Sequence, residues 1–137
     1  MKIRFVCLMT ISLALQTFFG IQNGHAETKR YVLVSEGRAH TCALTSTGMI
    51  DCWGFDGDNR IGLETSGDYI TSPVEKQGIS NVINFSTGIN TCAITKNGGL
   101  YCWGSGDVGR NGNGQTQTTL IPEQISKGVK FKQVASG

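Results

Sequence analysis

Short apolar runs separated by polar, glycine-containing segments fill the chain after residue 30. HTCALT and MIDCW flank residues 46–48, and NTCAIT and LYCW flank residues 96–98. Two such runs around a short turn that ends in glycine are typical of a β-hairpin. No stretch after residue 26 keeps an apolar period of 3.6, so the pattern predicts an all-β chain.

The hairpin pattern recurs after fifty residues. TCALTSTGMIDCWG (residues 41–54) overlays TCAITKNGGLYCWG (residues 91–104). Away from the hairpin the register slips by one residue, and VSEG at 34–37 corresponds to FSTG at 85–88 and to VASG at 134–137. Self-similarity at such a period is typical of repeat architectures. We expect repeat units at about 32–81 and about 82–131, and the start of a third at about 132–137.

Pairing in the first hairpin is symmetric if its turn centres on Thr47. Cys42 then lies opposite Cys52, and the same register places Cys92 opposite Cys102. Opposed residues of antiparallel strands lie about 4.5–5.5 Å apart, a distance that a disulfide can close in an oxidising compartment. We therefore predict two disulfides, one in each hairpin. The alternative is a four-thiolate zinc site, whose cysteine pairs are normally two to four residues apart, whereas nine residues intervene here.

Alternation along the strands gives each hairpin two faces. The residues expected to share one face are Cys42, Leu44, Ile50 and Cys52, and those expected on the other are Ala43, Asp51 and Trp53. Because both faces carry bulky side chains, we expect each sheet to be stacked between neighbours.

The two hairpin sequences, each followed by an Arg-x-Gly element and a Pro-containing segment, resemble the regulator of chromosome condensation repeat family. The resemblance covers essentially the whole chain after residue 26. It implies a β-propeller in which each repeat forms a four-stranded blade, usually with seven blades in a closed ring. The chain departs from this pattern because it holds only about two repeats, which predicts an incomplete ring.

An incomplete ring leaves sheet faces and strand edges in water. Three alternatives follow from this: the chain is a fragment of a longer propeller, it completes a ring by self-association, or it is a stable two-blade monomer. The sequence favours them in that order.

Residues 1–26 have the pattern of a secretory signal peptide. Two basic residues precede an apolar run over residues 5–19, and Gly24 and Ala26 occupy the small-residue positions before a cleavage site. The run is shorter than the roughly 20 residues of a membrane span, although an uncleaved anchor helix remains the alternative. We expect export of residues 27–137 as a partial propeller, either secreted or periplasmic, with no stable membrane anchor after cleavage.

The formal net charge of +2 resides in this predicted signal segment. Lys2 and Arg4 belong to it, so ten basic and ten acidic residues remain in the rest of the chain. A nucleic-acid-binding surface normally requires a basic excess. The composition therefore argues against nucleic acid as a partner.

Residues that carry chemistry are few. His40 is the one histidine after residue 26, and Asn90 takes its place in the second unit. This interchange favours a hydrogen-bonding role at the start of the strand over a catalytic base. Trp53 and Trp103 also recur at one place in the repeat, which favours packing between blades over ligand stacking.

Arg60 and Arg110 follow Cys-Trp-Gly in the two units, within the kind of loop that lies on a propeller face. We identify them as candidate surface-loop contacts. In the alternative they are structural and anchor the turn through hydrogen bonds to carbonyl groups.

Two further patterns resemble ligand sites. Asp56 and Asp58 match part of a calcium loop, but no glutamate closes the loop, and Gly106 and Val108 replace them in the second unit. Residues 104–109 satisfy the G-x-G-x-x-G pattern of a dinucleotide site, yet RNGNGQTQTT follows in place of a helix-forming segment. We predict no metal site and no cofactor.

We therefore expect a non-catalytic binding module that presents its loops to a protein partner. The resemblance implies one alternative, because founding members of the family promote guanine-nucleotide exchange on small GTPases. The same exchange role would also involve a protein partner.

Overall fold

The computed structural model describes residues 28–57, 59–63 and 69–137, and the predicted signal segment lies outside them. The described residues form eight β-strands and one turn of 3-10 helix. The strands are β1 (Tyr31–Glu36), β2 (His40–Thr45), β3 (Ile50–Phe55), β4 (Tyr69–Glu75), β5 (Val82–Thr87), β6 (Asn90–Thr95), β7 (Leu100–Gly104) and β8 (Thr119–Ile125), and the 3-10 turn is η1 (Asp107–Gly109). In this part of the chain no helix has the length and hydropathy of a membrane span.

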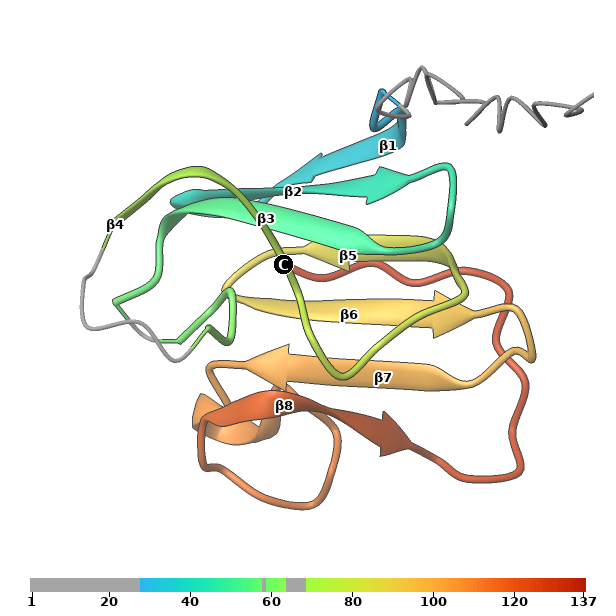
Figure 1. Cartoon of the computed structure of the whole chain (residues 1–137). Helices are drawn as coiled ribbons and strands as arrows, with labels where there is room; N and C mark the ends of the chain where they lie inside the picture. The colour runs from blue at the N-terminus through green and yellow to red at the C-terminus, as the bar shows by residue number, and fades with distance from the viewer. Residues whose placement is uncertain (1–27, 58, 64–68) are drawn as a thin grey trace, which may run out of the picture.

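The strands form two four-stranded antiparallel sheets, each in chain order, with β1 to β4 in the first and β5 to β8 in the second (Figure 1). We call the first sheet blade 1 and the second blade 2. The predicted all-β, propeller-type fold is confirmed, and within the described residues the two blades form no closed ring.

Both central hairpins have the predicted register. Cys42 pairs with Cys52 across β2 and β3, and Cys92 pairs with Cys102 across β6 and β7. The sulfur atoms lie 2.12 Å apart in blade 1 and 2.17 Å apart in blade 2, in agreement with the two predicted disulfides. Gly98 turns the second hairpin with a φ of 82°, in the left-handed region that glycine adopts without strain.

Replacement of Cys92 and Cys102 by alanine is expected to lower the free energy of unfolding by about 2–3 kcal/mol, because the disulfide closes a loop of about eleven residues. Urea denaturation measures the loss. The unreduced protein is treated with an alkylating agent under native conditions, and its intact mass is then measured. Alkylation of all four cysteines would contradict both disulfides.

The blades pack face to face through one apolar core, which we call the seam. Blade 1 contributes Cys42, Leu44, Ile50 and Cys52, and blade 2 contributes Val82, Phe85, Ala93 and Trp103. Blade 1 therefore presents its disulfide face to the seam, while blade 2 presents its alanine and tryptophan face. This is the stacking that the two bulky faces of each hairpin predict.

A hydrogen bond recurs at the same position from one unit to the next. The backbone N–H of Thr87 donates to Ser35 Oγ at 3.0 Å, and the backbone N–H of Ser136 donates to Ser86 Oγ at 3.0 Å. Gly88 lies so close to the last residue that an added Cβ would be 2.8 Å from its carbonyl oxygen. The beginning of the third unit therefore docks on blade 2 as blade 2 docks on blade 1.

Turns and long loops lie at opposite ends of the blades (Figure 1). We call the two ends the turn end, on the right of the figure, and the loop end, on the left. The turn end holds residues 28–30, 46–49, 76–81, 96–99 and 126–131. The loop end holds residues 37–39, 56–57, 59–63, 88–89 and 105–118.

Candidate functional site

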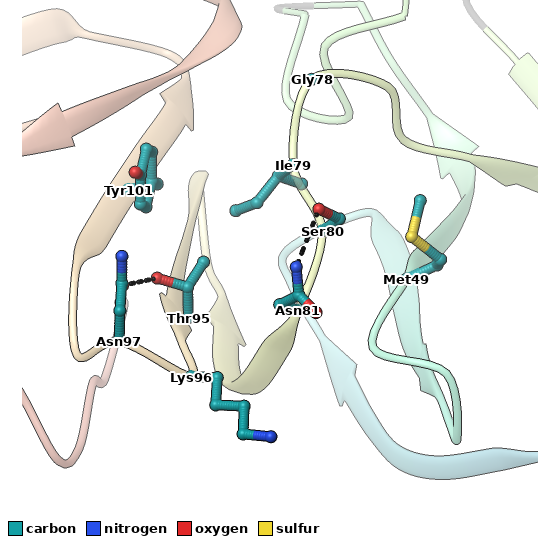
Figure 2. A pocket seen from close by; sticks show the side chains of 9 residues that line it. All are labelled: Met49, Gly78, Ile79, Ser80, Asn81, Thr95, Lys96, Asn97 and Tyr101. Carbon is teal, nitrogen blue, oxygen red and sulfur yellow. Dashed lines mark hydrogen bonds between the residues drawn. The ribbon is translucent and has the colours of Figure 1, made fainter.

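A pocket of about 720 Å³ opens at the turn end, between the two blades. Its lining residues are Met49, Gly78, Ile79, Ser80, Asn81, Thr95, Lys96, Asn97 and Tyr101. Figure 2 shows Met49 on one side, Tyr101 and Asn97 on the other, and the linker residues between them. The pocket therefore belongs to neither blade alone and exists because the seam holds the two hairpin turns at a fixed separation.

The side chain of Asn97 has a defined orientation. Its Oδ1 accepts hydrogen bonds from Thr95 Oγ1 at 2.6 Å and from the backbone N–H of Gly99 at 3.0 Å. These bonds occupy the amide oxygen, so the amide nitrogen is the group available to a ligand (Figure 2).

Asn81 closes the linker wall of the pocket. Its φ is 55°, a left-handed conformation that asparagine tolerates better than most residues, and its carbonyl accepts a 2.8 Å hydrogen bond from the N–H of Lys96. The next linker bends elsewhere, because its left-handed non-glycine residue is Ser126, near its start. This pocket therefore has a shape that the next linker does not repeat.

His40 is buried in the seam, with 3 % of its surface exposed. Its Nε2 lies 3.4 Å from Thr91 Oγ1, and its Nδ1 has no hydrogen-bond partner among the described residues. Burial, and secondarily the guanidinium of Arg60, lower the pKa of His40 from 6.5 to about 4. The imidazole is therefore neutral at pH 7.

The two candidate arginines occupy different environments. Arg60 is buried, its Cζ lies 5.5 Å from the centroid of the Phe55 ring, and its carbonyl accepts a hydrogen bond from Thr91 Oγ1. Arg110 is exposed and lies 3.8 Å from the carboxylate of Asp107. Only Arg110 is placed where a partner can reach it, and its contact role stays a prediction.

The tryptophans differ in the same way. Trp103 is completely buried in the seam, and its Nε1–H donates to the carbonyl of Ile61 at 3.0 Å. Strand alternation directs Trp53 to the face of blade 1 opposite Cys52, where it is only half-buried and borders the core cluster. Trp103 therefore has the inter-blade packing role that its place in the repeat predicts.

A polar cluster covers part of the outer face of blade 1. The carboxylate of the buried Asp51 accepts hydrogen bonds from Lys29 Nζ and Tyr31 Oη, both at 2.7 Å. The pKa of Lys29 is raised, and so is the pKa of Tyr31. In both cases the main cause is the hydrogen bond to Asp51. Tyr101 stands in place of Asp51 in blade 2, so this cluster is particular to blade 1.

The patterns that resembled ligand sites form turns. Asp56 is buried and its Oδ1 accepts a hydrogen bond from the N–H of Ile61 at 2.8 Å, while Asp58 lies outside the described residues. Burial raises the pKa of Asp56 despite these backbone hydrogen bonds. Residues 104–109 lead into η1 and not into a phosphate-binding helix. Among the residues with a described position, no group of three or more His, Cys, Asp and Glu side chains could hold a metal ion.

The sequence did not identify the pocket or the role of Lys76. The Lys76 side chain is buried, and its Nζ donates to the carbonyls of Gly62 and Leu120, both at 2.8 Å, which ties the two blades together. No pattern in the sequence signalled this lysine.

Comparison with solved structures identifies propeller proteins of similar fold. Human WBSCR16 superposes with a TM-score of 0.69 at 28% sequence identity, over 80% of this chain and 29% of that one. Yeast RCC1 (Prp20), in a structure with bound Kap60, gives a TM-score of 0.65 at 16% identity, over 74% of this chain and 26% of that one. Prp20p from Saccharomyces cerevisiae, in a study that names Gsp1p and histones, gives 0.60 at 16% identity, over 74% and 27%.

The chain thus spans less than a third of the length of these proteins. No curated protein matches the sequence. Two models of the regulator of chromosome condensation (RCC1) repeat match residues 32–60 and residues 97–137. These segments, of 29 and 41 residues, together cover just over half of the 137-residue chain. With its two four-stranded blades and its propeller relatives, the chain belongs to the RCC1 repeat family.

Proposed function

We propose that the chain acts as an exported, non-catalytic module that binds a protein partner. The observation that carries this proposal is the arrangement of turns and loops at two ends of a rigid pair of blades (Figure 1). Loops held by a rigid scaffold are the usual place for recognition. The structurally similar yeast Prp20 has been solved in complex with Kap60 and studied for its binding to Gsp1p and histones.

The environments of the titratable groups support a binding role over catalysis. His40 is neutral and buried, Asp51 is engaged by Lys29 and Tyr31, and the Asp56 carboxylate accepts a backbone hydrogen bond. Each of these groups is buried, and none of them lines the pocket between the blades.

Export to a secreted or periplasmic location fits the covalent structure. Both hairpins are closed by disulfides, which persist in oxidising compartments and are rare in the reducing cytosol. N-terminal sequencing of the chain recovered from the producing cell tests this, with Glu27 as the expected first residue. Recovery of the intact Met1 form from the cytosol would oppose export.

Photocrosslinking tests the binding role. A photoreactive amino acid replaces the exposed Gln77 at the turn end or the exposed Val108 at the loop end. We expect one of the two positions to form a crosslink to a single protein, and that crosslink should disappear when unlabelled chain is added in excess. Crosslinks at neither position, in the compartment where the chain is found, would refute the proposal.

Guanine-nucleotide exchange on a small GTPase is the second candidate. Its basis is the likeness to Prp20p, a protein studied for its binding to Gsp1p. Release of a fluorescent guanine nucleotide from Gsp1p and from other small GTPases measures this activity. A rate that does not change at high concentrations of the chain would eliminate this candidate and leave the binding role intact.

Self-association is a further expectation of the proposal. Blade 1 leaves one face outside the seam, where Val34 is 59% exposed, whereas the corresponding Phe85 of blade 2 is 3% exposed in the seam. A second copy would bury such a face. Sedimentation velocity distinguishes the outcomes, since a single monomeric species over a wide concentration range would rule self-association out.

A further inference from the structure

Charge is divided unevenly between the two ends of the blades, although the chain after residue 26 is neutral overall. Five exposed cations lie at the turn end, namely Lys29, Arg30, Lys96, Lys127 and Lys130. The carboxylates described at this end are those of Asp51 and Glu75, and both lie within ion-pair distance of Lys29, at 2.6 Å and 3.7 Å. Five exposed cations thus accompany two carboxylates at this end, an excess of three positive charges.

The described part of the loop end is balanced. Glu36 and Asp107 are exposed there together with Arg38 and Arg110, and the last of these pairs with Asp107 at 3.8 Å. The positive excess is thus a property of one end of the molecule and cannot be seen in the net charge.

The pocket between the blades lies within this basic end. Lys96 lines the pocket, and Figure 2 shows its ammonium group at the rim, away from Ile79 and Tyr101. Lys130 Nζ donates a hydrogen bond to the carbonyl of Asn97 in the neighbouring turn. Arg30 lines a smaller notch beside the corresponding turn of blade 1. A ligand in the pocket therefore meets Lys96 at the rim, with Lys130 and Arg30 at the hairpin turns of blade 2 and blade 1.

The interior of the pocket is of mixed character. Ile79 and Tyr101 provide apolar surface, while Asn97 offers an amide N–H, because its oxygen is already bonded. Apolar surface with a few placed polar groups is typical of sites that take one side chain and fix its backbone. The cations outside the pocket add electrostatic attraction and a faster association.

We propose that the pocket and the cations around it form a docking site for an acidic peptide segment of a partner protein. One apolar side chain enters between Ile79 and Tyr101, and the carboxylates on either side of it contact Lys96 and its basic neighbours. This assignment rests on the proposed binding role and names the chemistry of the partner. A polyanion without apolar groups would contact the cations alone and would leave the apolar surface of the pocket uncovered.

Selection of peptides tests the site. The disulfide-bonded chain of residues 27–137 is immobilised, and displayed random dodecamers are selected on it and resynthesised with a fluorescent label. We expect selected peptides to carry several Asp or Glu residues around one apolar residue, and their affinity to fall as ionic strength rises. Lys96→Glu should weaken binding about tenfold, because it reverses a charge at the rim of the pocket.

Two variants act as controls. Arg38→Glu makes the same change of charge at the loop end and should leave the affinity unchanged. Ser80→Trp fills the pocket without any change of charge and should abolish binding. Thermal unfolding confirms that each variant retains the stability of the parent chain.

The remaining outcomes contradict the site. Peptides without acidic residues, or affinities that are equal for the parent and Lys96→Glu, would overturn it. Heparin or an oligonucleotide that binds through Lys96 while Ser80→Trp has no effect would assign the basic end to a polyanion instead. If no peptide binds but Val108 still gives a crosslink, the docking site is refuted and the proposed binding role survives.

Discussion

Replacement of Trp103 by alanine is expected to lower the free energy of unfolding by about 3–5 kcal/mol, the usual cost of deleting a buried tryptophan. The indole is fully buried in the seam, so its removal leaves a cavity between the blades. The substitution also leaves the carbonyl of Ile61 without the N–H that it accepts. Urea denaturation followed by circular dichroism measures the loss.

Trp53 is the matched control for this experiment. It occupies the same place in the repeat, but it is only half-buried, at the border of the core cluster. Trp53→Ala should therefore cost less than half as much as Trp103→Ala. Equal losses would mean that burial in the seam gives Trp103 no larger contribution to stability than Trp53. That result would conflict with the packing described above.

The chain is expected to lose about 3 kcal/mol of stability between pH 6.5 and about pH 4 because of His40. The folded protein holds the pKa of this imidazole at about 4, whereas an unfolded chain restores the ordinary 6.5. Below pH 6.5 the unfolded state binds a proton that the folded state excludes, so stability falls with pH until the folded state is protonated as well. The difference between the two pKa values gives the magnitude.

His40→Asn isolates this contribution. Asparagine is the residue that blade 2 has at the same position, where Asn90 is buried and hydrogen-bonded. The free energy of unfolding of parent and variant, measured at several pH values, should differ by an amount that changes between pH 6.5 and 4 and is constant above pH 7. Parallel curves over the whole range would show that the imidazole is not kept neutral by the fold.

Features set by local geometry could be predicted from the sequence. Alternation of side chains along β2 and β3 determines which residues oppose one another, and Gly48 marks the turn. The register of both hairpins and the position of the disulfides follow from these two facts alone. The resemblance then predicted four strands in each blade, which is the number observed.

Features set by neighbouring units could not be predicted. Trp53 and Trp103, like Arg60 and Arg110, are equivalent in the sequence but have different burial, because only one member of each pair lies in the seam. The pocket depends on how the linker around Asn81 bends over the seam. The net charge of the chain does not reveal the basic end, because its cations come from turns that are far apart along the chain.

The position of each disulfide relative to the seam has a consequence for redox chemistry. Cys42 and Cys52 are completely buried between the blades, whereas Cys92 and Cys102 face outward beneath Val134. A soluble reductant can reach the outer bond once the segment around Val134 lifts away, but the inner bond only after the blades part. The state of the inner cysteines therefore reports whether the two blades have stayed together.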